Sequence, residues 1–192
     1  MQYPLWFAYA TGRLLRAEMA SINSSTTTER STTVTDSDRQ GVSIFEAAGG
    51  QEAFLRLATA YHQRCLDDPV LNHPFSHPGH PQHVERLAAY WAEVFGGPPT
   101  YTQEAGGHSS ILDIHARTQA DGDLGTRFVR CFVDALDDAG LPTDNDLRAA
   151  LRAYMEWAVR DVMNYSPADA VVPAGCPVPR WTWGGLQTDP DR

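Results

Sequence analysis

The sequence predicts a single all-α domain, because apolar residues recur at helical spacing along most of its length and no stretch alternates as a β-strand does. Apolar side chains stand three and four positions apart in residues 52–66, 82–95, 124–139 and 144–164. Proline or glycine follows these segments, and both residue types end helices. We therefore expect consecutive helices joined by short connections, with one further apolar segment over residues 110–116.

One face of each predicted helix carries the residues expected in the core. These residues are Phe54, Leu57, Ala58, Tyr61 and Cys65, then Val84, Leu87, Ala88 and Trp91, then Phe128, Val129, Phe132 and Leu136, and finally Leu147, Leu151, Tyr154, Met155, Ala158 and Val162. Cys65 and Cys131 both lie within these apolar patterns, so they are expected to be small core residues without a redox role. Residues 72–82 are rich in His, Pro and Gly, which predicts an irregular loop.

Two flanking segments differ in composition from the domain itself, which we place at residues 41–166. The run SINSSTTTERSTTVTDSDR is almost devoid of apolar side chains, so residues 1–40 are expected to be a disordered tail. Residues 167–192 contain several prolines, which forbid a helix, together with Trp181 and Trp183. Because tryptophans are costly to leave in water, this tail is expected to pack either onto the domain or onto a partner.

Composition and charge exclude several classes of protein. The 192 residues carry a net charge of −9, which argues against nucleic-acid binding, since phosphate recognition needs clustered Lys and Arg. No stretch approaches the ~20 apolar residues of a membrane helix, so no membrane association is expected. Three widely separated cysteines do not describe a disulfide framework, and a reducing cytoplasm fits this usage best.

Histidines are the residues with chemical interest, because no HExxH, nucleophile elbow or phosphate-binding loop occurs. His115 follows an apolar approach in SSILDIHARTQ, although a lone histidine near an apolar face is more often a core residue. His83 lies one turn before Leu87, and His62 lies one turn before Leu66. Periodicity permits His62 and His83 to face a common pocket but does not show it. The remaining histidines are expected in loops, where solvation is the first interpretation and a metal cluster the alternative: His73, His77, His80 and His108.

Five stretches in order resemble the truncated haemoglobins of bacteria: IFEAAGGQEAF, AYHQRCLDDPVL, HVERLAAYWAEVFGGPPTY, ILDIHA and RFVRCFVDALDDAGLP. The resemblance covers about residues 43–166 and is closest to group II of that family. In the family a Gly-Gly pair closes a short first helix, and Gly-Gly-Pro with a nearby Tyr ends the distal helix. Gly49-Gly50, Gly96-Gly97-Pro98 and Tyr101 occupy these places.

The resemblance implies a two-over-two helical sandwich around haem b, iron protoporphyrin IX. His115 falls on the proximal ligand, which leaves the sixth position of the iron open for a small ligand. Phe75 falls on the aromatic that wedges against the haem, and Leu87 falls on the distal face. Phe128 stands where many group II members carry Trp, and Tyr101 completes the haem-binding set.

The distal residues depart from the family pattern. Most members carry a Tyr as the distal hydrogen-bond donor, and that position holds His62 here. Tyr61 has moved by one place, which is about 100° around a helix. His83 falls on a position that is small in many group II members. The resemblance therefore implies a distal pocket that contains two histidines.

The expected function is reversible binding of O2 or another diatomic gas at the haem iron, with NO, CO and peroxide as further small ligands. The alternative is a haem oxidoreductase, either peroxidase-like or an NO dioxygenase, that receives electrons from a separate reductase. A third hypothesis is a helical sensor or interaction module without haem. The protein is expected to be a monomer or a homodimer.

Overall fold

The computed structural model describes residues 41–72, 80–120 and 122–187. In this part of the chain the helices are α1 (Ile44–Ala48), α2 (Gly50–Asp67), α4 (His83–Val94), α5 (Thr100–Ala105), α6 (His108–His115), α7 (Gly122–Asp138) and α8 (Asn145–Met163). Two short strands follow, β1 (Trp181–Thr182) and β2 (Gly185–Leu186). The tail predicted over residues 1–40 and most of the predicted loop at 72–82 lie outside the described residues.

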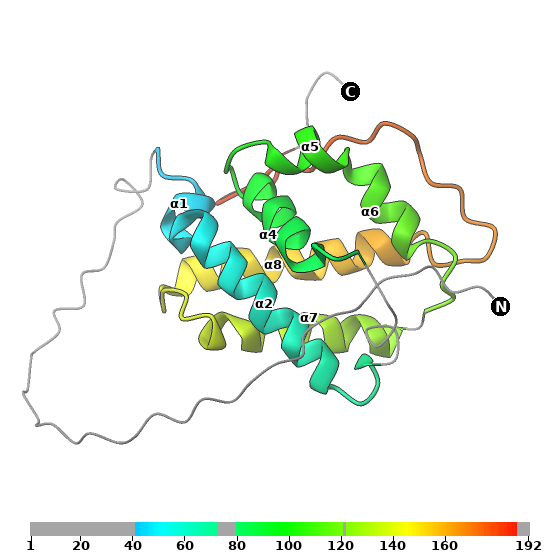
Figure 1. Cartoon of the computed structure of the whole chain (residues 1–192), viewed down its shortest axis with the longest axis horizontal. Helices are drawn as coiled ribbons and strands as arrows, with labels where there is room; N and C mark the ends of the chain where they lie inside the picture. The colour runs from blue at the N-terminus through cyan, green and yellow to red at the C-terminus, as the bar shows by residue number, and fades with distance from the viewer. Residues whose placement is uncertain (1–40, 73–79, 121, 188–192) are drawn as a thin grey trace, which may run out of the picture.

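The long helices form two layers, with α2 and α4 lying across α7 and α8 (Figure 1). α2 packs against both α4 and α7, and α7 packs against α8. The shorter helices α1, α5 and α6 lie around this arrangement (Figure 1). The all-α, two-over-two sandwich expected from the sequence is confirmed.

Local sequence explains where the helices begin and end. Ser43 caps α1 in a capping box, in which its Oγ accepts the Glu46 amide while the Glu46 carboxylate accepts the Ser43 amide over 2.8 Å. Gly49 ends α1 with φ = 106°, a left-handed conformation that favours glycine. Asp144 caps α8 by accepting the Leu147 amide over 2.8 Å. The predicted long helices match the observed ones to within a turn at each end.

One helix was not expected. The connection after Gly96-Gly97 forms α5, whose six residues are too few to show a periodic pattern. Its position depends on α4, because the Glu93 carboxylate accepts a hydrogen bond from the Thr102 amide over 2.9 Å and another from the Thr102 hydroxyl. A contact between two elements therefore determines this helix.

The core is built on aromatic side chains from three helices. Tyr61, Trp91 and Phe132 meet edge to face, with ring centroids 5.1–6.1 Å apart. The inward-facing residues predicted on α2 are all buried, including Cys65. Cys131 is buried as well, and burial raises the pKa of both thiols, which keeps them protonated and unreactive.

The tail after α8 packs onto the domain. Trp181 is buried and lies 5.7 Å, ring to ring, from Tyr154 and from Trp157 on α8. The Trp183 indole donates a hydrogen bond to the Val42 carbonyl over 2.8 Å. β1 and β2 pair antiparallel within this tail and are the only strands among the described residues. The sequence left open whether this tail packs onto the domain or onto a partner. Trp181 and Trp183 pack onto the domain.

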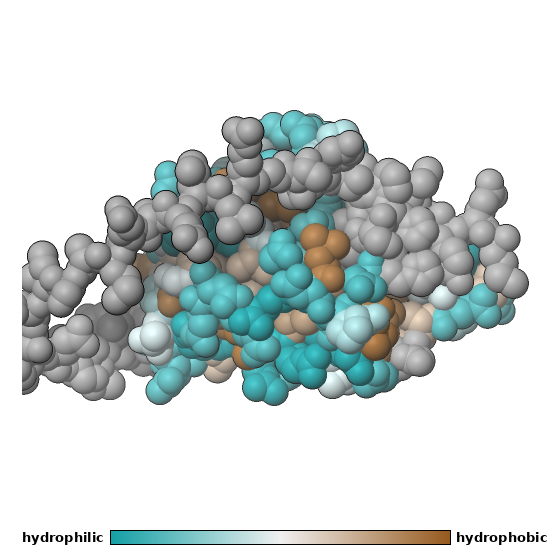
Figure 2. Space-filling model, turned by 60° about the horizontal axis from the view of Figure 1, so that its bottom comes forward, coloured by the Kyte–Doolittle hydropathy of each residue, from teal (hydrophilic) through white to brown (hydrophobic). Residues whose placement is uncertain are grey.

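The outer surface of the helices is mostly polar, as expected when their apolar faces lie in the core. The face that contains α7 is mostly hydrophilic, with isolated hydrophobic groups (Figure 2). Within the described residues, no helix combines the length and apolar character needed to cross a membrane.

We predict that Leu57→Ala lowers the free energy of unfolding by about 2–5 kcal/mol, because it opens a cavity at a fully buried position of α2. Leu55→Ala removes the same atoms from an exposed position of the same helix, and its effect should stay below about 0.5 kcal/mol. Urea unfolding followed by circular dichroism measures both variants. Equal effects would contradict the orientation of α2 described above.

Candidate functional site

Two imidazoles from different helices lie next to each other. His62 is on α2 and His83 is the first residue of α4, and their ring centroids are 5.4 Å apart with the planes tilted by 51°. Both residues are half-buried. Helical periodicity permitted His62 and His83 to face each other, and the fold brings their rings together.

The environment of His83 strongly disfavours its charged form. Burial is the main cause that lowers its pKa to about 3, and charges on His62 and His115 lower it further. The charge on His115 of α6 contributes less than burial does. Burial also lowers the pKa of His62. His83 is therefore a neutral imidazole throughout the physiological pH range.

His115 is the last residue of α6 and has a defined tautomer. Its Nδ1 donates a hydrogen bond to the Ile111 carbonyl oxygen over 2.8 Å, since that oxygen can only accept. The Nε2 atom therefore carries the lone pair that a metal ion would use. His115 keeps exposed surface, and yet the surrounding protein lowers the pKa of its imidazole through burial.

The other predicted site residues have different surroundings. Leu87 lies one turn after His83 on α4 and is half-buried, and Phe128 is half-buried on α7 against the core. Tyr101 is buried, with its ring 5.0 Å from that of Tyr90 and 6.0 Å from the Arg86 guanidinium. These contacts join α5 to α4. Phe75 lies outside the described residues, as do His73 and His77.

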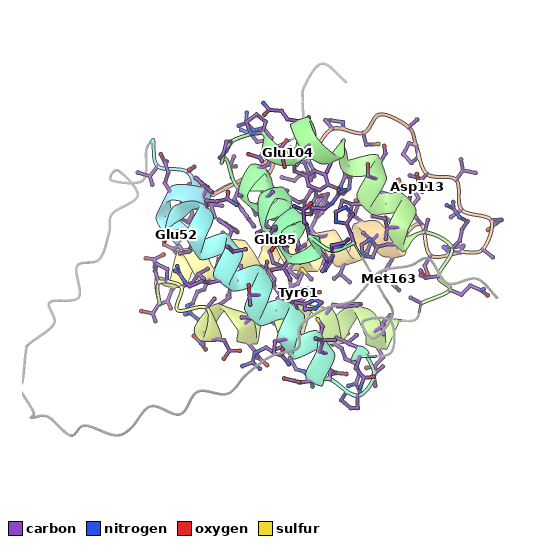
Figure 3. All side chains as sticks on the ribbon, viewed as in Figure 1. Glu52, Tyr61, Glu85, Glu104, Asp113 and Met163 are labelled. Carbon is purple, nitrogen blue, oxygen red and sulfur yellow. The ribbon has the colours of Figure 1, made fainter. Side chains whose placement is uncertain are left out.

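His108 contradicts its predicted place in a solvated loop. It is buried and begins α6, because this helix starts before the apolar segment that the sequence showed. Its Nδ1 is 2.7 Å from the Tyr90 hydroxyl of α4, and its Nε2 is 2.7 Å from the Asp161 carboxylate of α8. Nitrogen-bearing side chains accordingly gather between α4 and α6 (Figure 3).

One sequence signal could have located His108 correctly. His108 and His115 are seven positions apart, which is two helical turns and places both on one face of a helix. The preceding Gly106-Gly107 pair marked the helix start equally well. Of the remaining histidines, His80 is exposed, as predicted.

A groove of about 800 Å³ lies between α2 and α7, but it contains none of the predicted site residues. Charged side chains line it, and Arg64 of α2 crosses it to pair with Asp134 and Asp138 of α7. A mainly apolar cofactor would not be favoured there. No three His, Cys, Asp or Glu side chains gather as a metal-binding group in the described ranges. An iron atom that takes one protein ligand needs no such group.

Comparisons with known proteins concern the family and the fold of this chain. A family model described as "Bacterial-like globin" matches residues 43–161. The chain is similar to a thermostable hemoglobin from Thermobifida fusca, with 28% identity and a TM-score of 0.54 over 69% of this chain and 99% of that one. It is similar to a hemoglobin from Chloroflexus aurantiacus, with 26% identity and a TM-score of 0.55 over 63% and 97% of the two chains. The group II truncated hemoglobin from Bacillus anthracis shares the fold, with 21% identity, a TM-score of 0.56, and coverage of 64% and 92%.

We predict that acid destabilises the cofactor-free protein partly through His83. Between pH 6.5 and pH 3 the unfolded chain binds a proton at this residue that the folded chain does not, so stability falls as the pH falls. At pH 5 this loss is about 2 kcal/mol. His83→Gln should therefore show a smaller drop in unfolding free energy between pH 7 and pH 5 than the parent protein. His80→Gln controls for the removal of a histidine as such, and identical drops in the parent and His83→Gln would refute the prediction.

Proposed function

This chain belongs to the bacterial-like globin family, and we propose that it binds O2 or another diatomic gas reversibly at a haem b iron held by His115. As a globin whose structural neighbours include truncated haemoglobins, it is a haem-binding protein. The observation that carries the proposal is the adjacent pair of imidazoles, His62 and His83, in a domain whose His115 keeps Nε2 available.

Side chains on both sides of the proposed site suit a haem. The hydrogen bond to Ile111 orients the His115 ring and increases the basicity of Nε2, as is usual for histidines that bind metals. The lowered pKa keeps protons from competing with iron for this atom. Half-buried apolar side chains such as Leu87 and Phe128 suit the faces of a large apolar macrocycle. When bound, the haem supplies the coordination position at which a diatomic gas is held.

The distal imidazoles act as hydrogen-bond donors in this proposal. A neutral imidazole carries one N–H group, and His83 or His62 would direct it at the gas ligand. Such a bond stabilises a ligand that draws negative charge onto its outer atom, as O2 does. His83 has the better position to adjust, because it begins α4, whereas His62 lies within the continuous helix α2.

The alternative is a peroxidase-like or NO dioxygenase enzyme. In peroxide chemistry the distal imidazole would have to accept a proton instead of donating a hydrogen bond. A general base in peroxide chemistry must accept a proton, and it does so best when its pKa lies near the working pH. The pKa of about 3 at His83 favours an imidazole that keeps its N–H group and donates. Fast oxidation by peroxide together with rapid autoxidation of the O2 complex would support the enzyme instead.

We predict that His115→Ala abolishes stable haem binding and leaves a helical but less stable protein. The loss follows because one coordinate bond anchors the cofactor, and a bound cofactor stabilises the native state by mass action. Titration with haemin followed by absorption spectroscopy measures binding, and circular dichroism checks the helices. His80→Ala, at an exposed position, is the control and should bind like the parent. Stoichiometric haem with an unchanged spectrum in His115→Ala would show that the proximal assignment is wrong.

We predict that His83→Leu speeds O2 dissociation more than His62→Leu does, by about tenfold, which corresponds to ~1.4 kcal/mol. The same variant should remove any ferric form in which an imidazole is the internal sixth ligand. Stopped-flow measurement of O2 dissociation and ferric absorption spectra compare the two variants. If His62→Leu has the large effect and His83→Leu has none, the two roles are reversed.

A further inference from the structure

We propose that residues 165–176, which we call the C-terminal strap, hold α6 at both ends and thereby position His115 against the haem iron. This inference rests on the proposed function, because it concerns the helix that carries the proximal ligand. The strap lies beyond the residues that match the globin family model, which end at 161. It leaves the end of α8 and runs around the outer side of α6 (Figure 1).

At the beginning of α6, three hydrogen bonds join the helix to the strap. The His108 amide donates to the Cys176 carbonyl over 2.8 Å. The Ser109 hydroxyl donates to the Pro173 carbonyl over 2.7 Å and accepts the Cys176 amide over 2.9 Å. A helix start leaves four backbone amides without a partner in the helix, and the strap supplies the partner of one of them, the His108 amide.

The approach at this end is close enough to require a glycine. A Cβ atom on Gly107 would lie 2.4 Å from the Cys176 carbonyl oxygen, which is far inside contact distance. The obstructing atom belongs to the backbone, so it can move only if the strap itself shifts. Gly107 therefore marks a contact that the helix and the strap make directly through their backbones.

Five further hydrogen bonds join the strap to the residues that follow His115, and two of them link the Ser166 hydroxyl to the Thr118 hydroxyl and to the Ala120 carbonyl over 3.3 Å each. The Arg117 amide donates to the Tyr165 carbonyl over 2.8 Å, and the Gln119 amide donates to the Ser166 carbonyl over 2.9 Å. The Arg117 guanidinium donates to the Ala170 carbonyl over 3.0 Å. The strap thus contacts the chain on both sides of the proximal histidine.

The backbone at this second end is strained. Arg117 and Gln119 have φ values of 60° and 54°, the only positive values of non-glycine residues in the described ranges. Such conformations are unfavourable for residues that carry a Cβ and persist where surrounding contacts enforce them. The enforcing contacts here are the carbonyl groups of Tyr165 and Ser166. Without the strap, the segment after His115 would relax.

α6 needs support of this kind because it has eight residues, and isolated helices of that length are not stable in water. Its helix–helix packing is with α8. The side chain of His108 adds the links to Tyr90 and Asp161 described above, but these act at the beginning of the helix. The strap bonds reach the residues that follow the other end, where His115 lies.

Two pairs of variants test the proposal in the full chain. Ser109→Ala removes both side-chain hydrogen bonds to the strap, and Ser110→Ala is its control on the next residue of the same helix. Gly107→Ala pushes the strap away from α6, and Gly184→Ala makes the same change in the tail, where the nearest atom is 3.8 Å from the added Cβ. Ser109→Ala keeps the test decisive if Gly107→Ala does not fold.

Three measurements apply to each variant. Hydrogen exchange of the α6 amides is measured in the haem-free protein, and exchange should be about fivefold faster in Ser109→Ala than in Ser110→Ala. Haem transfer to excess apomyoglobin should also be about fivefold faster. The iron–histidine stretching band in resonance Raman spectra should shift or broaden, since this band reports the bond made by His115 and not the stability of the fold.

The outcomes separate this proposal from the proposed function. If hydrogen exchange of the α6 amides is unchanged in Ser109→Ala and Gly107→Ala, the proposal that the strap holds α6 is wrong. If exchange is faster but haem transfer and the iron–histidine band are unchanged, the proposal that the strap positions His115 is wrong. A parent protein that does not retain haem overturns the proposed function. Exchange in haem-free protein then decides by itself whether the strap holds α6.

Discussion

A single hydrogen bond, from Nδ1 of His115 to the Ile111 carbonyl, decides which nitrogen of the imidazole is available for chemistry. It is made within α6, a helix too short to be stable alone. The site therefore depends on how the rest of the domain holds this helix. Tyr90 from α4 and Asp161 from α8 meet at His108 and fix the beginning of the helix. These bonds are buried or half-buried, where a hydrogen bond is stronger than in water and costly to leave unmade.

His62 and His83, the two other histidines of the site, are held neutral by burial. His62 and His83 place polar rings among apolar side chains, and burial removes their charge instead of pairing it. Two protonated imidazoles there would repel each other across the 5.4 Å between their ring centroids. Neutrality thus lets two histidine rings lie next to each other. It also favours hydrogen-bond donation over proton acceptance, which is the chemical distinction between binding a gas and reacting with peroxide.

The two-layer core gives both sides of the site a rigid frame. Tyr61, Trp91 and Phe132 interlock α2, α4 and α7 at positions adjacent to the functional side chains. Tyr61 immediately precedes His62 and faces this core, which turns His62 away from it by about 100°. An aromatic residue therefore occupies the core position, and the neighbouring polar ring of His62 lies beside His83.

The sequence by itself determined the helices and the core face of each, because both follow from local periodicity and from proline and glycine at the ends. Resemblance to a family added His115 and the two distal histidines. Tertiary structure alone decided the role of His108, whose partner Asp161 is 53 positions away, and the packing of the tail through Trp181. It also decided that α5 exists, since Glu93 bonds hold it. Each of these features depends on a contact between distant segments, and spacing within one helix carries no information about which segments meet.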